Sequence, residues 1–511
     1  MSQNSQINNK RIAKNTIFLY IRMILILVIN LYTSREILQV LGVEDYGIYN
    51  VVGGIVMLLS FLNAALSNGS SRFITYEMGQ KNGKINSVFQ SSFVAHVILS
   101  IIIVIIAETI GLWFVYNKCV IPPERLSAAV FAYHCSILTS MVTITQVPYT
   151  ALIISHEKMG IYAYISIIEA VLKLSVVFML FAAPIDKLKY YAILLCIVQI
   201  SIAMCYRLYC TKQYSESSLR NLKVDWKKIR EIVSFSSWSL FGNAAHALNG
   251  QGLTIITNLF FSPAVVAARA LSVQVNGAAM HLVQNLSTAA NPQVVKLYSS
   301  GEISSSTALM LNTARYSFMM MLIMAVPFIV TCNEILSLWL VDVPDYTVIF
   351  VQLIMIQSLF FTLDTCFYIG LYACGRVREN AIISPSLYFV QFIITYFLFN
   401  WGYSPIALSV VGIITAFAAG VIAKPILLHR FSGVKYQDVI KVVARCSMTA
   451  ILALSLPLFL LSTLNDNVIN SIIKFLVSII MGFTAVFLVG LNKEEKIKLR
   501  DFVIKHINYK H

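Results

Sequence analysis

The chain of 511 residues is 58% hydrophobic and only 12% charged, with a mean hydropathy of +0.76 and a formal net charge of +15. This composition excludes a soluble globular protein of such length. Apolar runs long enough to span a membrane recur from Thr16 almost to Leu491, with mostly short hydrophilic segments between them. We therefore predict a multi-pass membrane protein whose function lies in its membrane-embedded part.

Apolar runs of about 20 residues predict an all-α polytopic fold with fourteen transmembrane helices. The predicted spans cover residues 16–40, 46–67, 88–116, 126–153, 161–183, 190–210, 229–260, 264–290, 309–332, 346–373, 381–400, 404–428, 440–463 and 468–491. The first span is long, carries Arg22 and Arg35, and is not followed by a small-residue cleavage site, which is unlike a signal peptide. We expect it to remain as the first helix.

The distribution of basic residues predicts the orientation. Most of the 38 Lys and Arg residues lie in the N-terminal segment, in every second loop and in the C-terminal tail, whereas the alternate loops hold only Lys118, Arg125, Lys187 and Lys189. By the positive-inside rule both termini are cytoplasmic. Membrane topology therefore accounts for most of the net charge without a nucleic-acid partner, and the basic tail could lie on anionic lipid.

Two pairs of similar segments indicate an internal duplication. The segment "LSNGSSRFITYEMG" from Leu66 aligns with "LSTAANPQVVKLYS" from Leu286, and a segment from Tyr149 aligns with one from Tyr368, both at an offset of about 220 residues. Each pair occupies the cytoplasmic end of an apolar span. Duplicated bundles that face each other across a midplane cavity are typical of alternating-access transporters.

The duplication predicts four parts of the chain. They are an N-terminal six-helix bundle at residues 1–210, a basic cytoplasmic linker at 211–228, a C-terminal six-helix bundle at 229–430, and helices 13 and 14 with a basic cytoplasmic tail at 431–511.

Charged residues within the predicted spans divide by position. Those close to a helix end are expected to extend toward the interface, where a charge costs much less than at the bilayer centre. They are Arg35, Glu36, Glu108, Arg315, Lys424 and Lys474. Glu169 and Lys173 have i, i+4 spacing and can neutralise each other as an intrahelical pair. A role of Glu169 in ion coupling is the alternative.

Three charges remain at lipid depth. Arg22 lies in the cytoplasmic half of helix 1, Arg269 lies in the outer half of helix 8, and Asp364 lies in helix 10. If both arginines face a cavity between the bundles, they offer guanidinium donors at two depths, which suits a phosphate or pyrophosphate group. An interhelical salt bridge or a carbonyl-bound arginine is the alternative. Asp364 is a candidate for ion coupling.

Helices 7 and 8 are unusually rich in uncharged polar groups. Such groups are costly at lipid depth unless they line water or contact one another, and groups of this type bind sugars. The candidates for the lining of a substrate cavity are Asn243, His246, Asn249, Gln251 and Asn276. Helix packing through small and polar residues is the alternative for the individual side chains.

No catalytic chemistry is visible. The sequence has no phosphate-binding Walker loop, no H-E-x-x-H pattern and no G-x-S-x-G pattern. Most of the nine cysteines lie in apolar runs without metal-ligand spacing, so we expect neither a disulfide framework nor a metal site. We predict a transporter that is not an enzyme and carries no cofactor.

The N-terminal region resembles a known family. The features are Arg22 within "NTIFLYIRMILILVINLY", the turn "LGVEDYGIYN" into helix 2, and the end of helix 2 with Arg72, which runs into "FITYEMGQKN". Together they resemble the bacterial polysaccharide biosynthesis proteins, which are flippases of lipid-linked O-antigen or capsule repeat units in the multidrug/oligosaccharidyl-lipid/polysaccharide exporter (MOP) superfamily. The likeness extends loosely over the whole chain and makes Arg72 a candidate cytoplasmic gate residue.

The resemblance implies a function in the bacterial inner membrane. The substrate would be an undecaprenyl-pyrophosphate-linked glycan, with Arg22 and Arg269 as cations for its pyrophosphate, and the partners would include membrane lipids, a glycan polymerase and a chain-length regulator. Helix 1 lacks the acidic neighbour expected of a lipid II flippase. The alternatives are a cation-coupled multidrug antiporter of the same superfamily, a membrane glycosyltransferase or polymerase, and a non-transporting scaffold.

Overall fold

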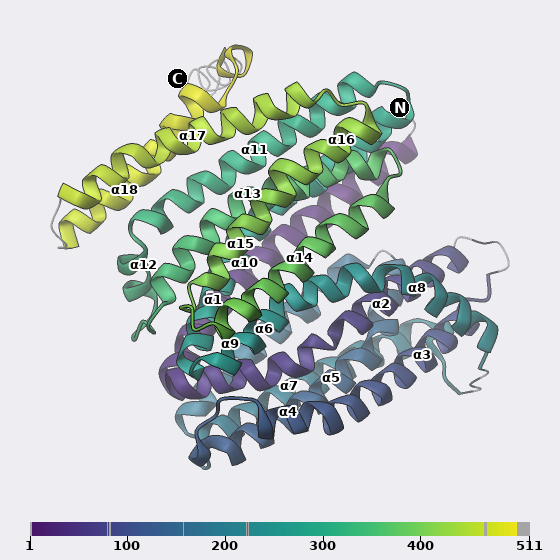
Figure 1. Cartoon of the computed structure of the whole chain (residues 1–511). Helices are drawn as coiled ribbons and strands as arrows, with labels where there is room; N and C mark the ends of the chain where they lie inside the picture. The colour runs from purple at the N-terminus through teal and green to yellow at the C-terminus, as the bar shows by residue number, and fades with distance from the viewer. Residues whose placement is uncertain are drawn as a thin grey trace, which may run out of the picture. The chain divides into compact units, whose positions relative to one another are not determined.

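The computed structural model describes residues 3–78, 80, 83–156, 158–220, 222, 224–463 and 468–497. Long helices dominate, and the described part of the chain contains no β-strand (Figure 1). The predicted all-α class is confirmed.

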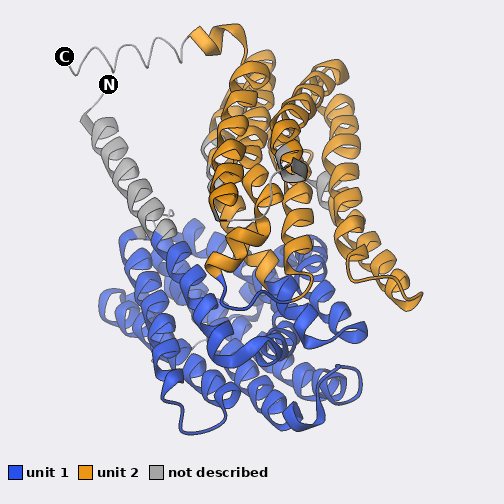
Figure 2. Ribbon diagram, turned by 90° about the vertical axis from the view of Figure 1, so that its left-hand side faces the viewer, with its two compact units in different colours: residues 1–270, 340–344 blue, residues 271–339, 345–511 orange. Residues whose placement is uncertain are grey.

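Contacts divide the chain into two compact units, which are coloured separately in Figure 2. Unit 1 comprises residues 1–270 and 340–344, and unit 2 comprises residues 271–339 and 345–511. The division falls inside one long helix, α10, and not at residues 211–228, so the first two helices after that linker pack within unit 1. The division into duplicated bundles stays a prediction.

The helices of unit 1 begin and end as follows. They are α1 (Gln3–Leu58), α2 (Ser60–Met78), α3 (Ile85–Ile106), π-helix η1 (Ala107–Gly111), α4 (Leu112–Asn117), 3₁₀ turn η2 (Pro123–Arg125), α5 (Leu126–Ser155), α6 (Met159–Phe181), α7 (Lys187–Gln213), 3₁₀ turn η3 (Ser215–Ser217), α8 (Trp226–Ala247), π-helix η4 (Leu248–Gly252), α9 (Leu253–Phe260) and the start of α10 (Pro263–Ser299).

Unit 2 takes the rest of α10 and the helices that follow. They are α11 (Ile303–Val330), α12 (Cys332–Trp339), α13 (Thr347–Ala373), α14 (Val377–Asn400), α15 (Ala407–Phe417), π-helix η5 (Ala418–Ala423), α16 (Lys424–Ser432), α17 (Tyr436–Thr463), α18 (Val468–Ala485) and π-helix η6 (Val486–Gly490).

Helix α1 is two helical segments joined at a sharp bend. Gly42 has φ 81° and ψ 167°, a left-handed backbone angle that glycine adopts without steric cost. The bend lies in the "LGVEDYG" stretch between the first two predicted spans. Just beyond it, a Cβ on Gly47 would lie 2.0 Å from the carbonyl oxygen of Pro263, so a glycine allows α1 to approach the start of α10.

Eleven helices formed by described residues are long and apolar enough to cross a membrane. The first, Leu25–Leu58, joins two predicted spans through Gly42, and the other ten coincide with single predicted spans. The predicted spans at 229–260 and 264–290 fall outside this set; they are the segments with the densest polar side chains. The total of fourteen stays a prediction.

The core of unit 1 forms where α1, α5 and α7 pack around Tyr133, which is fully buried. Its hydroxyl donates to the carbonyl oxygen of Ala107 at 2.8 Å, at the start of π-helix η1. A Cβ on Gly111 would lie 2.1 Å from that hydroxyl, so the small residue makes room for the tyrosine. In unit 2 the corresponding packing is of α11 against α13, α17 and α18, with Phe350 and Phe367 fully buried.

The linker after α7 is fixed to unit 1. Asn86 Nδ2 donates to the carbonyl oxygen of Glu216 at 2.7 Å, and Gln90 Nε2 donates to that of Ser218 at 2.9 Å. His156 Nε2 lies 2.8 Å from the Glu216 carboxylate. The Asp225 side chain then caps α8 by accepting from the backbone N–H of Lys227 at 3.1 Å.

Candidate substrate site and buried charges

A π-helix positions part of the predicted polar cluster. Helix α8 leads into η4, whose sequence "LNGQG" carries Asn249 and Gln251, before α9 continues. Single turns of π-helix interrupt the regular i to i+4 hydrogen bonding and occur frequently at functional sites. A Cβ on Gly54 of α1 would lie 3.3 Å from Oε1 of Gln251, so this amide side chain lies directly against α1.

Arg269 is brought to the same π-helix. It lies in the part of α10 that belongs to unit 1, its side chain is only 6% exposed, and its Nη2 donates to the carbonyl oxygen of Asn249 at 3.5 Å. A buried guanidinium in a membrane helix is costly unless hydrogen-bond acceptors surround it. Its planar fork of five N–H donors matches the oxygens of a phosphate. The structure therefore brings Arg269 to the short π-helix that carries two other predicted site residues, Asn249 and Gln251.

Two other predicted residues of α8 differ in exposure. His246 is exposed, whereas Asn243 is half-buried. The amide nitrogen of Asn243 is buried without a hydrogen-bond partner among the described residues. Such an orphaned donor is costly and is a property of sites that bind a polar ligand or water.

Asn276 lies in unit 2, where its Oδ1 accepts a hydrogen bond from the Ser358 hydroxyl at 2.5 Å. This contact joins α10 to α13, as expected for polar packing between membrane helices. Arg22 lies outside the residues whose side chains the structure describes, so its role stays a prediction.

Asp364 forms a buried ion pair in unit 2. Its Oδ1 lies 3.3 Å from Lys424 Nζ, and the Ser384 hydroxyl donates to the same oxygen at 3.4 Å. The Lys424 side chain is 1% exposed and lies 5.3 Å from the ring centre of Tyr368. The expectation that Lys424 extends to the interface is therefore wrong, because the lysine turns inward to a carboxylate.

The approach of these two charges depends on π-helix η5, which ends directly before Lys424. A Cβ on Gly420 would lie 2.6 Å from the carbonyl oxygen of Phe360, so η5 packs backbone against backbone with α13. The sequence did not reveal this pair, because Asp364 and Lys424 lie on different helices 60 residues apart.

Arg315 is a second buried cation of unit 2. It donates to Asn312 Oδ1 at 3.0 Å and to the carbonyl oxygen of Gly490 at 3.4 Å, and it pairs with the Glu495 carboxylate. Burial alone would raise the pKa of Glu495, but the Tyr316 hydroxyl, the Asn492 N–H and the Arg315 charge outweigh it and lower that pKa.

The expectation that Arg315 extends toward the interface is wrong, because the protein satisfies its charge internally. The same holds for Lys474, whose side chain is fully buried.

The remaining predicted residues have ordinary partners. Lys173 Nζ donates to Glu169 Oε1 at 2.7 Å, which is the intrahelical pair expected from their spacing. Arg72 is exposed in the second half of α2, where its guanidinium carbon lies 4.2 Å from the ring centre of Phe235 on α8. Arg72 therefore links α2 to α8 through a cation–π contact.

One ionic network in unit 1 was not predicted from the sequence. Arg125 donates from Nε to Asp45 at 2.7 Å and from Nη1 to Asp186 at 2.6 Å. It thereby joins three chain segments that the topology prediction places at the outer surface. All three residues lie in or beside predicted outer turns, so the predicted topology places them on the same side of the membrane, although it does not pair them.

The fold is similar to that of several solved membrane transporters, all at low sequence identity. The lipid II flippase MurJ, in an inward closed conformation, superposes with a TM-score of 0.70 over 96% of this chain and 100% of its own, at 12% identity. A MOP superfamily transporter from Pyrococcus furiosus gives 0.61 over 82% of this chain and 96% of its own, at 11% identity. The multidrug transporter DinF-BH gives 0.58 over 83% and 97%, at 18% identity.

The sequence itself assigns the family. Residues 10–298 match the profile of the family described as Polysaccharide biosynthesis protein. This match covers more than half of the chain, so the protein belongs to the polysaccharide biosynthesis protein family. None of the curated proteins matches it in sequence.

Proposed function

We propose that the protein is a flippase that moves undecaprenyl-pyrophosphate-linked oligosaccharide repeat units from the cytoplasmic to the outer leaflet, for assembly of O-antigen, capsule or exopolysaccharide. The family match gives polysaccharide biosynthesis, and the similar solved structures give a transporter fold. The observation that carries the proposal is Arg269, a buried cation hydrogen-bonded to the backbone of π-helix η4, the segment that carries Asn249 and Gln251.

The chemistry of this region suits such a cargo. The Arg269 guanidinium can donate two parallel hydrogen bonds to pyrophosphate oxygens. Asn243, His246, Asn249 and Gln251 supply the donors and acceptors that sugar hydroxyls require. Arg22 and Asn276 complete the proposed set, and Arg72 is the proposed cytoplasmic gate residue.

Transport would occur by alternating access, with the polyprenyl tail remaining in lipid. Asp364 and Glu169 are the proposed sites of coupling to an ion gradient. Both already have a lysine partner, Lys424 and Lys173, so protonation or ion binding would have to compete with an existing ion pair. The protein would lie in the inner membrane with both termini cytoplasmic, and a polymerase and chain-length regulator would use the flipped unit.

The test is leaflet-resolved measurement of undecaprenyl-pyrophosphate-linked glycan in a deletion strain. Complementation uses the wild type, Arg269→Ala, Arg269→Lys and Arg22→Ala at matched membrane levels. Arg230→Ala is the matched control, because Arg230 is an exposed arginine of α8. We expect lipid-linked glycan to accumulate on the cytoplasmic face in the deletion strain and in the strains complemented with Arg22→Ala or Arg269→Ala.

Arg269→Lys separates charge from geometry. Lysine retains the positive charge but loses the planar fork, so we expect partial clearance. If Arg269→Ala clears the lipid-linked glycan normally, Arg269 is not part of the transport path. If the deletion strain accumulates no lipid-linked glycan, the proposal that the protein is a flippase is wrong.

The second candidate is a multidrug efflux antiporter, which the fold of DinF-BH favours. A transporter of organic cations needs an available carboxylate. Among the described residues of unit 1, the only buried carboxylate is Asp45, and Arg125 already engages it. Efflux of a cationic dye from cells that express the wild type, with no effect on lipid-linked glycan, would favour the antiporter.

A further inference from the structure

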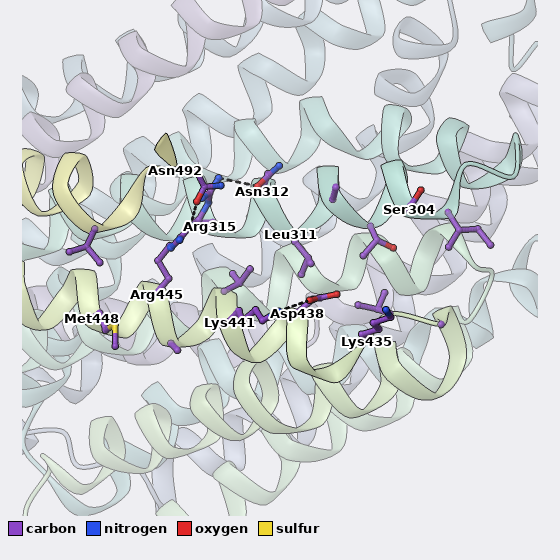
Figure 3. Close-up of a pocket in the computed structure, with 18 of the residues that line it drawn as sticks. Ser304, Leu311, Asn312, Arg315, Lys435, Asp438, Lys441, Arg445, Met448 and Asn492 are labelled. Atoms are coloured by element: carbon purple, nitrogen blue, oxygen red, sulfur yellow. Dashed lines mark hydrogen bonds and ion pairs between the residues drawn. The ribbon is translucent and has the colours of Figure 1, made fainter. Parts of the chain in front are cut away.

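Unit 2 contains a groove that the proposed transport path does not use. It lies between α11 and α17, is closed at one side by the end of η6, and has a volume of about 1110 Å³. Figure 3 shows Lys435 and Met448 at opposite ends of this groove, with the Arg445 side chain directed toward Asn492 between them. All its lining residues belong to unit 2.

A row of cations runs along the groove. They are Lys435, which directly precedes α17, and Lys441 and Arg445 on α17, whereas Asp438 is the one carboxylate in the lining. Asp438 lies 3.4 Å from Lys441, in a pair whose lysine is 75% exposed and therefore weakly held. Arg445 contacts the amide oxygen of Asn492 and forms no ion pair with any described carboxylate. The groove thus has an excess of positive charge.

The end of the groove at Met448 is apolar and open. Met448 is 62% exposed and Leu488 is 55% exposed, although both belong to apolar membrane spans. Met448 follows Arg445 by about one helical turn, so the apolar surface begins directly beyond the cations. A cationic rim at a membrane surface followed by an apolar channel matches one molecule with an anionic head and hydrocarbon chains.

We propose that this groove binds a resident anionic phospholipid of the inner leaflet. Its phosphate lies between Lys441 and Arg445, which are about one helical turn apart on α17, with Lys435 adding positive charge from before the helix, and an acyl chain extends along Leu488 and Met448. Basic pockets between membrane helices on the cytoplasmic side are a known mode of anionic headgroup recognition. The site is separate from the cargo and does not rest on the proposed function.

A bound phospholipid would also join the last two helices to the rest of unit 2. Arg315 already holds α11 to the segment after η6 through Gly490 and Glu495. The lipid would extend this connection along α17. The chain beyond residue 497 is an unsuitable occupant, because it carries Lys498, Arg500, Lys505 and Lys510 against Asp501 alone and would meet like charge.

The test is native mass spectrometry of the full-length protein in detergent, titrated with phosphatidylglycerol or with phosphatidylcholine of the same chains. We expect the wild type to retain phosphatidylglycerol in preference. Lys435→Gln/Lys441→Gln should weaken that binding about 25-fold and Arg445→Gln about fivefold, since each basic residue near an anionic headgroup contributes about one factor of five. Lys212→Gln/Arg230→Gln removes two exposed charges from unit 1 and should leave the binding unchanged.

Melting temperatures in lipid-free detergent verify the fold of each variant. Lys435 and Lys441 are exposed, so the lysine pair remains a valid test even if Arg445→Gln fails to fold. Equal retention of the two lipids, or equal loss in the control and groove variants, would overturn the proposal. Displacement of phosphatidylglycerol by undecaprenyl phosphate would also overturn it, because the groove would then belong to the cargo.

Discussion

Lys424 Nζ lies 3.3 Å from Asp364 Oδ1 in the interior of unit 2, and both side chains are almost fully withdrawn from solvent. Removing two opposite charges from water costs several kcal/mol for each ion, and their attraction offsets this only with good geometry. Ser384 adds a hydrogen bond to the same carboxylate oxygen. The pair is thus stable only as a unit.

We expect Lys424→Met to destabilise the protein by about 3–5 kcal/mol, because Asp364 would remain buried without its countercharge. The double variant Asp364→Asn/Lys424→Met should recover most of the loss, since it removes both charges. Melting temperatures of the purified proteins in detergent measure both effects. Equal loss in the single and double variants would show that the pair contributes through packing alone.

The same double variant tests the proposed coupling role of Asp364. If Asp364 exchanges an ion during transport, Asp364→Asn/Lys424→Met should fold normally but fail to clear the lipid-linked glycan. Normal clearance would restrict the pair to a structural role.

The sequence was sufficient for the parts of the structure that depend on local composition. Helix positions, the bend at Gly42 and the Glu169–Lys173 pair follow from apolar run length, a glycine turn and i, i+4 spacing. Each of these features depends on residues close together in the chain. Arg269 could also be identified from the sequence as a candidate functional residue, because a cation deep in an apolar run is costly and therefore marks a functional-site hypothesis.

The partners of the buried charges were not predictable in this way. Lys424 and Arg315 lie near the ends of the spans predicted at 404–428 and 309–332, where extension to the interface is the ordinary expectation. Their partners become visible only in the packed structure. The packing of α13 against η5 places Asp364 beside Lys424, and the packing of α11 against the segment after η6 places Glu495 beside Arg315. π-helices have no simple sequence signature, so η4 and η5 were invisible as well.

Gly47 is expected to tolerate no side chain. A Cβ there would lie 2.0 Å from the carbonyl oxygen of Pro263, and backbone atoms of a helix start have little freedom to move. We expect Gly47→Ala to destabilise the protein by about 3 kcal/mol through overpacking. Gly242→Ala, in α8 with open space around the added methyl, is the matched control and should stabilise slightly. Equal melting temperatures for the two variants would contradict the close approach of α1 and α10.

Gln251 is expected to act in transport more than in stability. Gln251→Ala should reduce clearance of the lipid-linked glycan severalfold while the melting temperature stays near that of the wild type, because the side chain is half-buried in a polar region. The added Cβ of Gly54→Ala would lie 3.3 Å from Gln251 Oε1, which is a tight contact. The added Cβ of the neighbouring Gly53→Ala would lie 3.9 Å from Ser136 Oγ, which is an ordinary contact.

The two glycine variants should therefore differ in clearance, and Gly54→Ala should add nothing in a Gln251→Ala background. If Gly54→Ala still reduces clearance of the lipid-linked glycan in a Gln251→Ala background, its effect is due to helix packing and not to Gln251.

The Arg125 network is expected to make the stability of unit 1 depend on pH. Burial alone would raise the pKa of Asp186, but the hydrogen bonds from Arg125 and from the Lys189 N–H outweigh it and lower that pKa below its ordinary 3.8. A carboxyl with a lowered pKa stabilises the folded state above its ordinary pKa, and this contribution is lost as the pH falls toward the folded value.

Arg125→Ala should therefore cost about 2 kcal/mol near pH 6, since hydrogen bonds to charged groups contribute about 1.5–3 kcal/mol, and distinctly less near pH 3. The measurement is the melting temperature of wild type and variant across this range, with Lys118→Ala as a control cation of the same predicted outer surface. Lys118 contacts the Trp113 ring and, within the part of the chain that the structure describes, pairs with no carboxylate, so its effect should be small and independent of pH. A difference between wild type and Arg125→Ala that stays constant from pH 6 to pH 3 would mean that Arg125 stabilises unit 1 by packing and not through the charge of Asp186.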